Sequence, residues 1–512
     1  MLEKLLQNIK DENVGIITNY FSKQFLNRVY NIFEVPKDNF INYIKMNNLS
    51  TLFIDNEIYE SDHIWYKREI NGLLAHAKLK NIKIIIIRNT EKKLQNTYLD
   101  YSYIEIQTTN RSMSEDNKVS IPVLIDEKKY NPSHSVKTID VLYIKRGKLL
   151  RTINIQEYHA NIKPIKEEIV FEALSRKVLF NILDKIKKAK CVYVYDIDEW
   201  DKVLLQFIEV FSVSQNTVIL GESERYESDF SIINNDIVTV NNILLFNDDE
   251  QYRDRTLIPI QRKALYEHSF SLRDSLTCNN ISRPDISVIT STNRKYNLDD
   301  YIQRMNAQKN VNLQVILVTH GFSLTELEKE NIYHHANNIQ VQIYEADSDL
   351  PLGYCLNLAI SKIEYDYVAK VDDDDYYFEN YLFDAWLAAK YTDADLVGKY
   401  STYTYFKSRK LMIRKYLNTH RKYHNFVMGA TFFAKSNLMR KYQFSYLSTG
   451  EDSDFLRRIN EDNVKVYTDH PYNFCIFRSG DVDNHTWKIS DLEYMRNAQI
   501  IHIETPSKIV SI

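Results

Sequence analysis

The sequence is poor in glycine, proline and cysteine. Its 512 residues include only 10 glycines and 9 prolines, far below the usual shares of about 7% and 5%, which excludes collagen-like, glycine-linker and proline-stalk architectures. The four cysteines contain no C-x-x-C pair, so no zinc cage or redox dithiol of that kind is indicated. Four thiols in so long a chain also make no disulfide scaffold, which favours a reducing cytoplasm.

A dominant charge and a membrane-spanning run are missing as well. The sequence has 65 Lys and Arg against 69 Asp and Glu, a formal net charge of −4, so no global basic field predicts nucleic-acid binding. Residues 1–15 carry acids where a signal peptide needs an apolar run. The most apolar stretch, 82–87 (IKIIII), is far shorter than the ~20 residues that cross a bilayer. We expect a cytoplasmic protein that binds no nucleic acid, with peripheral contact at the inner face of a membrane left open.

What is present is the composition of a folded protein, 44% hydrophobic and 26% charged. Apolar runs such as 83–88 (KIIIIR) and 191–198 (CVYVYDID) alternate with helix-like segments such as 167–188, where apolar residues recur at helical spacing. This alternation predicts an α/β fold with mainly parallel sheets. Turn-forming breaks near 131–135 and 278–285 predict three domains, namely 1–132, 133–280 and 281–512.

In the last of these domains, polar motifs follow directly on predicted strands. Ligands of open α/β sheets bind beyond the carboxyl ends of the strands, so such motifs predict a ligand site. The most acidic motif, Asp372 to Asp375, follows the strand 365–371 (YDYVAKV). The other pairs are 286–290 (ISVIT) before 291–294 (STNR), and 313–318 (LQVILV) before 319–321 (THG).

The four consecutive aspartates point to a divalent cation. Adjacent carboxylates repel one another unless a cation neutralises them. Alternate side chains of an extended segment share a face, so Asp372 and Asp374 can face one ion. Mn²⁺ and Mg²⁺ take oxygen ligands and leave positions open for substrate phosphates. A solvated acidic turn is the alternative, whereas an EF-hand is excluded because Tyr377 stands where its loop needs glycine.

Taken in order, the motifs of residues 284–490 resemble those of the family 2 glycosyltransferases. The resemblance implies a GT-A fold, a Rossmann-like nucleotide-diphospho-sugar transferase domain, in residues 281–512. It rests on seven pieces in the family's order: 291–294 (STNR), 319–321 (THG), the G-x-x-x-N of 353–357, 371–375 (VDDDD), 429–431 (GAT), 450–452 (GED) and 485–487 (HTW).

The same resemblance implies roles for individual residues. Asp372 and Asp374 would bind the metal that bridges the donor diphosphate, and His485 would complete the metal shell unless it is a structural or surface histidine. Asp452, with Glu451 beside it, resembles the general base that takes the acceptor's proton; capping of the following helix is the alternative. The implied donor-binding residues are Thr290, Thr292, Asn293, Arg294, Thr319, Asn357, Asp372, Asp373, Asp375, Gly429 and Ala430.

The implied activity is the transfer of one sugar, a hexose or N-acetylhexosamine, with inversion. The donor would be a nucleotide-sugar, by default a UDP-sugar, although 318–322 (VTHGF) lacks the acids that pair with uracil in many relatives. The acceptor would be a glycan, polyol-phosphate or protein of a bacterial envelope or spore surface. Residues 407–424 carry seven Lys or Arg and no acid, which indicates either an anionic partner or a solvated hairpin face. A nucleotidyl- or phosphotransferase at the same acidic site and a noncatalytic partner-binding scaffold are the alternatives.

Residues 50–275 resemble, through fewer pieces, GT-B-like glycosyltransferase domains of the spore-maturation type. Close approach of a backbone to phosphate generally requires glycine, but the segment 171–174 (FEAL) continues as SRKV. We therefore expect an inactive or acceptor-binding region here rather than a second active site. The other matching pieces are 121–132 (IPVLIDEKKYNP) and 266–276 (YEHSFSLRDSL).

Overall fold

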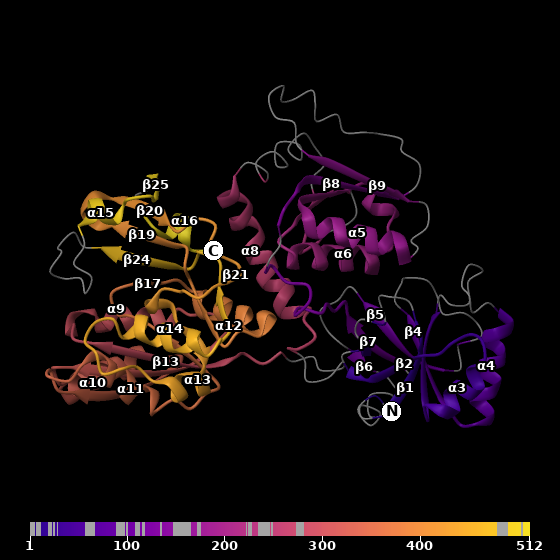
Figure 1. Cartoon of the computed structure of the whole chain (residues 1–512), viewed down its shortest axis with the longest axis horizontal. Coiled ribbons are helices and arrows are strands. Elements are labelled where there is room, and N and C mark those ends of the chain that lie inside the picture. Colours follow the sequence, from indigo (N-terminus) through magenta and orange to yellow (C-terminus); the bar gives the residue numbers. More distant parts are fainter. Residues whose placement is uncertain are drawn as a thin grey trace, which may run out of the picture. The chain divides into compact units, whose positions relative to one another are not determined.

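The structure, a computed structural model, divides into two compact units. Unit 1 is Met1–Ile281 and unit 2 is Ser282–Ile512; both contain sheets with helices between the strands (Figure 1). The residues described are 12–18, 29–56, 67–88, 101–107, 113–114, 118–133, 136–146, 165–171, 176–221, 228–233, 249–272, 281–478, 490–502 and 505–512, with the single positions Leu6, Lys23, Leu26, Asn27, Tyr98, Ser223 and Phe246.

The first sheet of unit 1 has seven strands in the order β2-β1-β3-β4-β5-β7-β6. All its pairs among the described strands are parallel except β6–β7. Ile84 to Ile87 of β4 are buried, as a strand covered on both faces requires. The elements are β1 (Asn13–Ile17), β2 (Asn31–Glu34), α3 (Phe40–Met46), β3 (Thr51–Asp55), α4 (Lys67–Leu79), β4 (Lys83–Arg88), β5 (Ser102–Gln107), β6 (Met113–Ser114) and β7 (Lys118–Pro122).

The second sheet of unit 1 has five parallel strands in the order β12-β11-β10-β8-β9. The chain leaves β8 toward β9 on one side and continues with β10 on the other, so the strand order reverses between β8 and β10. The elements are β8 (Ile139–Arg146), β9 (Lys166–Phe171), α5 (Arg176–Lys188), β10 (Ala189–Val194), η4 (Ile197–Glu199), α6 (Lys202–Ser214), β11 (Val218–Gly221), β12 (Ile232–Ile233) and α8 (Glu250–Glu267).

One predicted helix of unit 1 is wrong in its first part. The periodicity predicts a helix over 167–188, but the residues up to Phe171 belong to β9, which pairs in parallel with β8 at the edge of the sheet. Val170, one of the apolar residues at this helical spacing, is 45% exposed. The pairing of its backbone with β8 makes this segment a strand. A short edge strand shows little hydrophobic periodicity in the sequence.

Unit 2 contains an eight-stranded sheet in the order β15-β14-β13-β16-β22-β18-β23-β21. The four strands from β15 to β16 are parallel, whereas β22 is antiparallel to both of its neighbours. The prediction of α/β architecture with mainly parallel sheets is confirmed. The strands are β13 (Asp285–Thr292), β14 (Asn312–His320), β15 (Ile339–Ala346), β16 (Tyr367–Lys370), β18 (Leu396–Gly398), β21 (Lys422–Tyr423), β22 (Phe433–Lys435) and β23 (Val466–Thr468).

A second sheet of unit 2 has the order β17-β24-β19-β20-β25. Its strands are β17 (Tyr376–Tyr377), β19 (Thr402–Phe406), β20 (Leu411–Lys415), β24 (Phe474–Arg478) and β25 (Gln499–His502). The helices of unit 2 are η5 (Lys295–Asn297), α9 (Leu298–Asn306), α10 (Glu326–His335), α11 (Leu352–Ile360), α12 (Tyr381–Thr392), η6 (Lys407–Arg409), η7 (Gly429–Thr431), α13 (Ser436–Tyr442), α14 (Glu451–Glu461), α15 (Asp491–Tyr494) and α16 (Ser507–Val510).

One apolar core fixes α14 against the large sheet of unit 2. Phe455, Leu456 and Ile459 lie on the buried face of α14 and belong to the same core cluster as Val368 of β16 and Phe432. Their spacing of three and four residues is that of an amphipathic helix. The first turn of α14 is therefore held at a constant position relative to the carboxyl end of β16.

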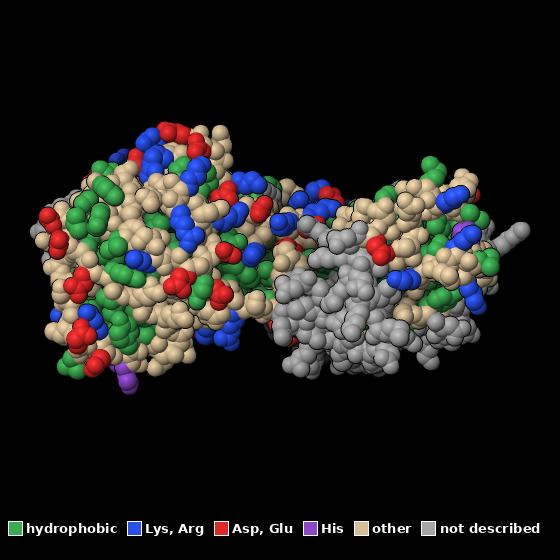
Figure 2. Space-filling model, turned by 90° about the horizontal axis from the view of Figure 1, so that it is seen from below, with side chains coloured by type: hydrophobic (Ala, Val, Ile, Leu, Met, Phe, Trp, Pro, Cys, Tyr) green, Lys and Arg blue, Asp and Glu red, His purple; other side chains and the backbone are tan. Residues whose placement is uncertain are grey.

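The described residues contain no membrane-spanning helix, and the face seen in Figure 2 carries charges of both signs. None of their helices is both long and apolar enough to cross a bilayer. On the face shown in Figure 2, Lys and Arg side chains are interspersed with Asp and Glu, in agreement with the formal net charge of −4.

Candidate active site

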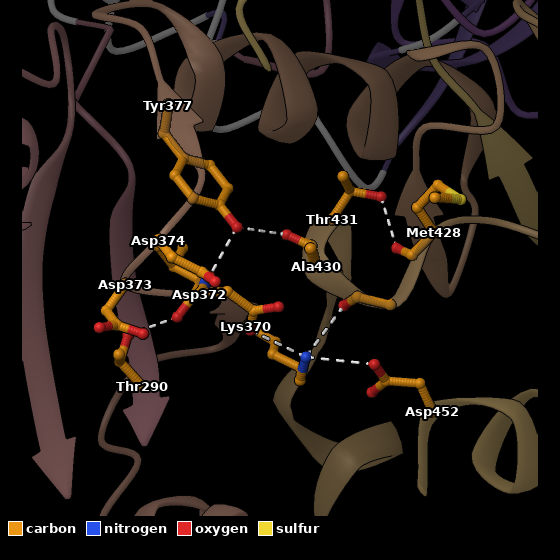
Figure 3. Close-up of polar contacts among 12 residues, drawn as sticks. Thr290, Lys370, Asp372, Asp373, Asp374, Tyr377, Met428, Ala430, Thr431 and Asp452 are labelled. Carbon is orange, nitrogen blue, oxygen red and sulfur yellow. Dashed lines mark hydrogen bonds and ion pairs between the residues drawn. The ribbon is translucent and has the colours of Figure 1, made fainter. Parts of the chain in front are cut away.

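The four aspartates lie in the turn that connects β16 to β17, at the carboxyl end of β16. The backbone N–H of Asp372 donates to Oη of Tyr377 at 2.9 Å, and this hydroxyl donates to the carbonyl of Ala430 at 2.7 Å (Figure 3). Tyr377 thus joins the acidic turn to η7, which contains two of the predicted donor-binding residues, Gly429 and Ala430.

Asp373 is the anchor of the acidic turn rather than a free ligand. Its carboxylate is 3% exposed and accepts hydrogen bonds from Thr292 at 2.9 Å, Arg294 at 2.8 Å and Asn297 at 3.1 Å. Its carbonyl accepts a further bond from Arg304 at 2.6 Å. The STNR segment at the end of β13 and the aspartates at the end of β16 therefore form one hydrogen-bonded unit, as the parallel pairing of these strands allows.

Burial and the neighbouring aspartates disfavour the ionised forms of Asp374 and Asp375. Burial, opposed by Arg294 and reinforced by the charge of Asp372, raises the pKa of Asp374 to about 6. Its ion-pair partner is Nη2 of Arg294, at 3.0 Å. Burial, reinforced by Asp374, raises the pKa of Asp375 well above its usual range, although its Oδ1 accepts a bond from the N–H of Phe477. Carboxyl groups in this state favour the arrival of a cation.

Lys370, the last residue of β16, connects the acidic turn to α14. Its ammonium donates to Oδ1 of Asp372 at 3.0 Å, to Oδ2 of Asp452 at 3.2 Å and to the carbonyl of Gly429 at 3.5 Å (Figure 3). Burial disfavours the charged ammonium, but the attraction of the two aspartates outweighs it and raises the pKa of Lys370. The predicted metal-binding motif and the predicted base thus meet at one buried charge.

Asp452 lies in the first turn of α14, beside Glu451. Its Oδ1 is buried and accepts no hydrogen bond from the described residues. Burial raises the pKa of Asp452, with Lys370 opposing the change, and burial together with the charge of Asp452 raises the pKa of Glu451 to about 7. A Cβ on Gly429 would lie 1.8 Å from Oδ2 of Asp452, so only glycine permits this approach.

Three predicted donor-binding residues hold other parts of the protein. Thr290 donates to the carbonyl of Val371 at 2.7 Å, and Thr319 to that of Tyr344 at 3.4 Å. The side-chain amide of Asn357 both donates to and accepts from the backbone of Phe444, at 2.7 and 2.8 Å. Thr290 thus holds the backbone just before Asp372, Thr319 links β14 to β15 and Asn357 fixes α11; among the described residues, none of the three side chains has a hydrogen bond to an aspartate of the acidic turn.

Two further predicted donor-binding residues, Asn293 and Arg294, lie in different surroundings. Asn293 is exposed, and Arg294 spans Asp373 and Asp374. His485 and the whole HTW motif lie outside the described residues, so the predicted third metal ligand stays a prediction.

The basic stretch 407–424 is a surface only in part. Arg414 is buried, and its Nε donates to Oγ of Ser401 at 3.1 Å; Arg421 is buried as well. The exposed cations Lys407, Arg409 and Lys410 belong to the turn between β19 and β20. Exposure of this turn is compatible with both interpretations, a solvated hairpin face and an anionic partner, whereas the buried arginines serve the fold.

Lys370 and Tyr377 are the site residues that sequence reasoning missed. One signal for Lys370 was available: it precedes Asp372 by two residues, and residues two apart share a face of a strand. In the sequence, Tyr377 serves only to exclude an EF-hand. Nothing in the sequence indicates that its hydroxyl would reach Ala430, a residue 53 positions further on.

Comparison with known proteins gives no family. No family model and no curated protein matches this chain. Among solved structures, S. aureus TarS 1–349 is 20% identical with a TM-score of 0.29, over 38% of this chain and 60% of that chain; its complex with UDP-GlcNAc gives 18% and 0.30 over the same shares. The mannosyltransferase PcManGT from Pyrobaculum calidifontis, in complex with GDP-Man and Mn²⁺, is 14% identical with a TM-score of 0.30, over 45% of this chain and 66% of that chain.

These matches span less than two thirds of each of the three chains. At such TM-scores they carry no argument about this chain, and the case for its function rests on the geometry of the acidic turn, Lys370 and Asp452.

Proposed function

We propose that unit 2 is a divalent-metal-dependent, inverting glycosyltransferase of the GT-A type. It would transfer a hexose or N-acetylhexosamine from a nucleotide-sugar, by default a UDP-sugar, to a glycan, polyol-phosphate or protein acceptor of a bacterial envelope or spore surface. The observation that carries the proposal is the meeting of Asp372 and Asp452 at Lys370, because these aspartates come from segments far apart in the sequence.

The residues of the acidic turn fit a divalent cation. Asp372 to Asp375, Glu451 and Asp452 supply six carboxyl groups, and Lys370 and Arg294 form ion pairs with some of them. Asp372 and Asp374 would hold the ion, since Asp373 is already saturated by hydrogen bonds; His485 is proposed as a third ligand. When bound, such an ion neutralises the charge that develops on the departing nucleoside diphosphate.

Asp452 has the features that a general base needs. Oδ1 is buried without a hydrogen-bond donor among the described residues, and the raised pKa makes the carboxylate a stronger proton acceptor. In the proposed step Oδ1 takes the proton of the acceptor hydroxyl. The acceptor oxygen forms a bond to the anomeric carbon while the bond from that carbon to the diphosphate oxygen breaks. Attack from the side opposite the diphosphate inverts the anomeric centre.

The remaining parts of the chain are assigned more coarsely. The donor would lie beyond the carboxyl ends of β13 and β16, where open α/β sheets bind ligands, with Arg294 and Thr292 on one side of it. The exposed Lys407, Arg409 and Lys410 suit an anionic acceptor. Unit 1 is proposed to be a GT-B-like region that binds the acceptor or is inactive. Peripheral contact of the protein with a membrane is compatible with this proposal.

Donor turnover by the purified full-length chain tests the proposal. The chain is incubated with Mn²⁺ and a panel of UDP-, GDP- and CDP-sugars, and released sugar and nucleotide are quantified. We expect release of free nucleoside diphosphate, its loss in EDTA and its return on addition of Mn²⁺. Turnover that is unchanged in EDTA would overturn the metal assignment. Release of nucleoside monophosphate with sugar phosphate would instead indicate a nucleotidyl- or phosphotransferase, and donor binding without turnover a scaffold.

A further inference from the structure

Lys370 is buried where a charge is unfavourable unless it is fully paired. The residue is 3% exposed, and removing an ammonium group from water is costly without partners of opposite charge. The ammonium has three N–H donors, and three oxygens lie within hydrogen-bond distance: two aspartate carboxylates and the Gly429 carbonyl. Its backbone N–H donates to the carbonyl of Phe432 at 2.8 Å, so the residue is fixed at both ends.

The contact with Asp452 is directional. Lys370 holds Oδ2, and the same oxygen lies against the Cα of Gly429, where an added Cβ would be 1.8 Å away. The other oxygen, Oδ1, is buried and receives no hydrogen bond from the described residues. A carboxylate fixed through one oxygen presents the other in a defined direction, and Oδ1 is thereby the oxygen left for an incoming proton.

A second buried lysine of unit 2 shows what a purely structural pair looks like. Lys399 is 2% exposed, its ammonium lies 3.4 Å from Asp469 and it donates to the carbonyl of His470 at 2.6 Å. None of these partners belongs to the acidic turn or to the first turn of α14. Lys370 differs because both of its carboxylate partners are groups assigned to the reaction.

We propose that Lys370 is a positioning residue for the transfer reaction: its ammonium holds Oδ2 of Asp452 so that Oδ1 faces the acceptor hydroxyl. The inference rests on the proposed function and adds a residue to it. In this role Lys370 acts through Asp452 and not directly on the substrates.

The contact between Lys370 and Asp372 leads to a second expectation, which concerns Mn²⁺ affinity and does not follow the expected loss of turnover. A cation that binds Asp372 competes with the ammonium for the same carboxylate. Removal of the ammonium therefore leaves Mn²⁺ affinity equal or higher, although it misplaces Asp452. A lysine with only a structural role would give the reverse pattern, since a distorted turn weakens metal binding.

The test compares Lys370→Met with the matched control Lys399→Met in the full-length chain. Donor turnover in Mn²⁺ and the Kd of Mn²⁺ by calorimetry are both measured, with circular dichroism to establish that each variant is folded. We expect Lys370→Met to lower kcat by about 10²-fold without weakening Mn²⁺ binding, and Lys399→Met to lower the melting temperature while kcat of the folded protein is retained. An unchanged kcat in Lys370→Met would overturn the proposal, and so would a weakened Mn²⁺ affinity.

A double-mutant cycle with Asp452→Asn adds a readout that structural damage does not mimic. If Lys370 acts through Asp452, Lys370→Met lowers the residual turnover of Asp452→Asn by no more than about twofold. Multiplied losses in the double variant would show that the two residues act separately and would refute the positioning role. Lys370→Arg, which keeps the charge, is expected to recover part of the turnover lost in Lys370→Met.

The wild-type chain separates this proposal from the one on which it rests. If wild-type protein turns over no donor, the proposed function fails and the role of Lys370 falls with it. If wild type turns over a donor and Lys370→Met does so equally well, the proposed function stands and only the role of Lys370 is wrong.

Discussion

Each unit has a buried lysine at the carboxyl end of a parallel strand, but the surroundings of the two lysines differ. In unit 1, Lys145 of β8 lies 3.5 Å from Asp196, whose side chain is 53% exposed. In unit 2, Lys370 of β16 lies within 3.2 Å of two carboxylates from separate segments. A buried lysine at the end of a parallel strand thus has one exposed carboxylate partner in unit 1 and two carboxylate partners in unit 2.

Asp198, the second acidic residue after β10 of unit 1, also differs in its surroundings from the acids of unit 2. Asp198 is exposed and accepts a hydrogen bond from Ser223 at 2.7 Å, so water and a hydroxyl stabilise its charge. Asp374, Asp375 and Glu451 of unit 2 have pKa values raised by burial. Raised pKa values of buried acids are typical of functional sites, and the parallel-sheet architecture that the two units share does not by itself produce them.

The largest effect is expected from Asp452→Asn. The amide keeps the shape of the side chain but cannot accept the acceptor's proton, so turnover should fall by about 10²–10⁴-fold while donor binding is retained. Transfer rates and donor titrations of the purified variant measure this. Asp198→Asn in unit 1 is the matched control and should transfer at the wild-type rate. Normal transfer by Asp452→Asn would place the base elsewhere and remove the contrast between the units.

Gly429→Ala should have the next largest effect. The new methyl group meets Oδ2 of Asp452 and must displace it, and a displacement of about 1 Å at a reacting group costs roughly 10²-fold in rate. Gly72→Ala in α4 of unit 1 is the control, because its nearest atom, Cζ of Phe40, is 4.0 Å from the new Cβ. Equal rates for the two variants would mean that Asp452 need not occupy its observed position.

A smaller effect, on binding, is expected from Asp374→Asn. Loss of a proposed metal-ligating charge should weaken Mn²⁺-dependent donor binding by roughly 10-fold or more, measured by calorimetry at fixed Mn²⁺. Asp196→Asn tests the corresponding acid of unit 1, where we expect no change, since Asn tolerates the left-handed backbone that Asp196 adopts at φ 50°. Equal weakening by both variants would place metal binding outside the acidic turn.

Glu451→Gln should change stability more than turnover, and only at higher pH. The pKa of Glu451 is raised from 4.5 to about 7 in the folded protein, so the folded state binds this proton more tightly than the unfolded state. Wild type loses that advantage as pH rises from 4.5 through 7. At pH 8 the Gln variant should be more stable than wild type by about 1–3 kcal/mol, since each pKa unit corresponds to about 1.4 kcal/mol and solvent screening lowers the total. At pH 4.5 the two should be nearly equal, as chemical denaturation in EDTA can measure. A difference independent of pH would contradict the burial of this carboxyl.

The strands next to the site were predictable because buried parallel strands are nearly continuous apolar runs. The runs 286–290, 313–318 and 365–371 correspond to β13, β14 and β16. The acidic turn was recognisable for the same reason, since it follows one of these runs directly. Edge strands have a weaker hydrophobic pattern, and the periodicity therefore predicts a helix where β9 lies.

Residues whose partners are distant in the sequence were not predictable. Asn357 matched a motif position, but its amide serves the backbone of Phe444, 87 positions away. Lys370 is a lysine next to aspartates, a pattern that also describes any solvated ion pair. Its burial and its contact with Asp452, 82 positions away, depend on how α14 packs against β16.

Local sequence features were enough for the α/β class, for β13, β14 and β16 of the large sheet of unit 2 and for the acidic turn at the end of β16, because apolar runs and strand-end motifs can be recognised without knowing the tertiary contacts. The tertiary structure decided which acids are buried, which are saturated by hydrogen bonds and which two meet at Lys370. These properties depend on distances and on exclusion of water, which arise only when segments far apart in the chain share one core.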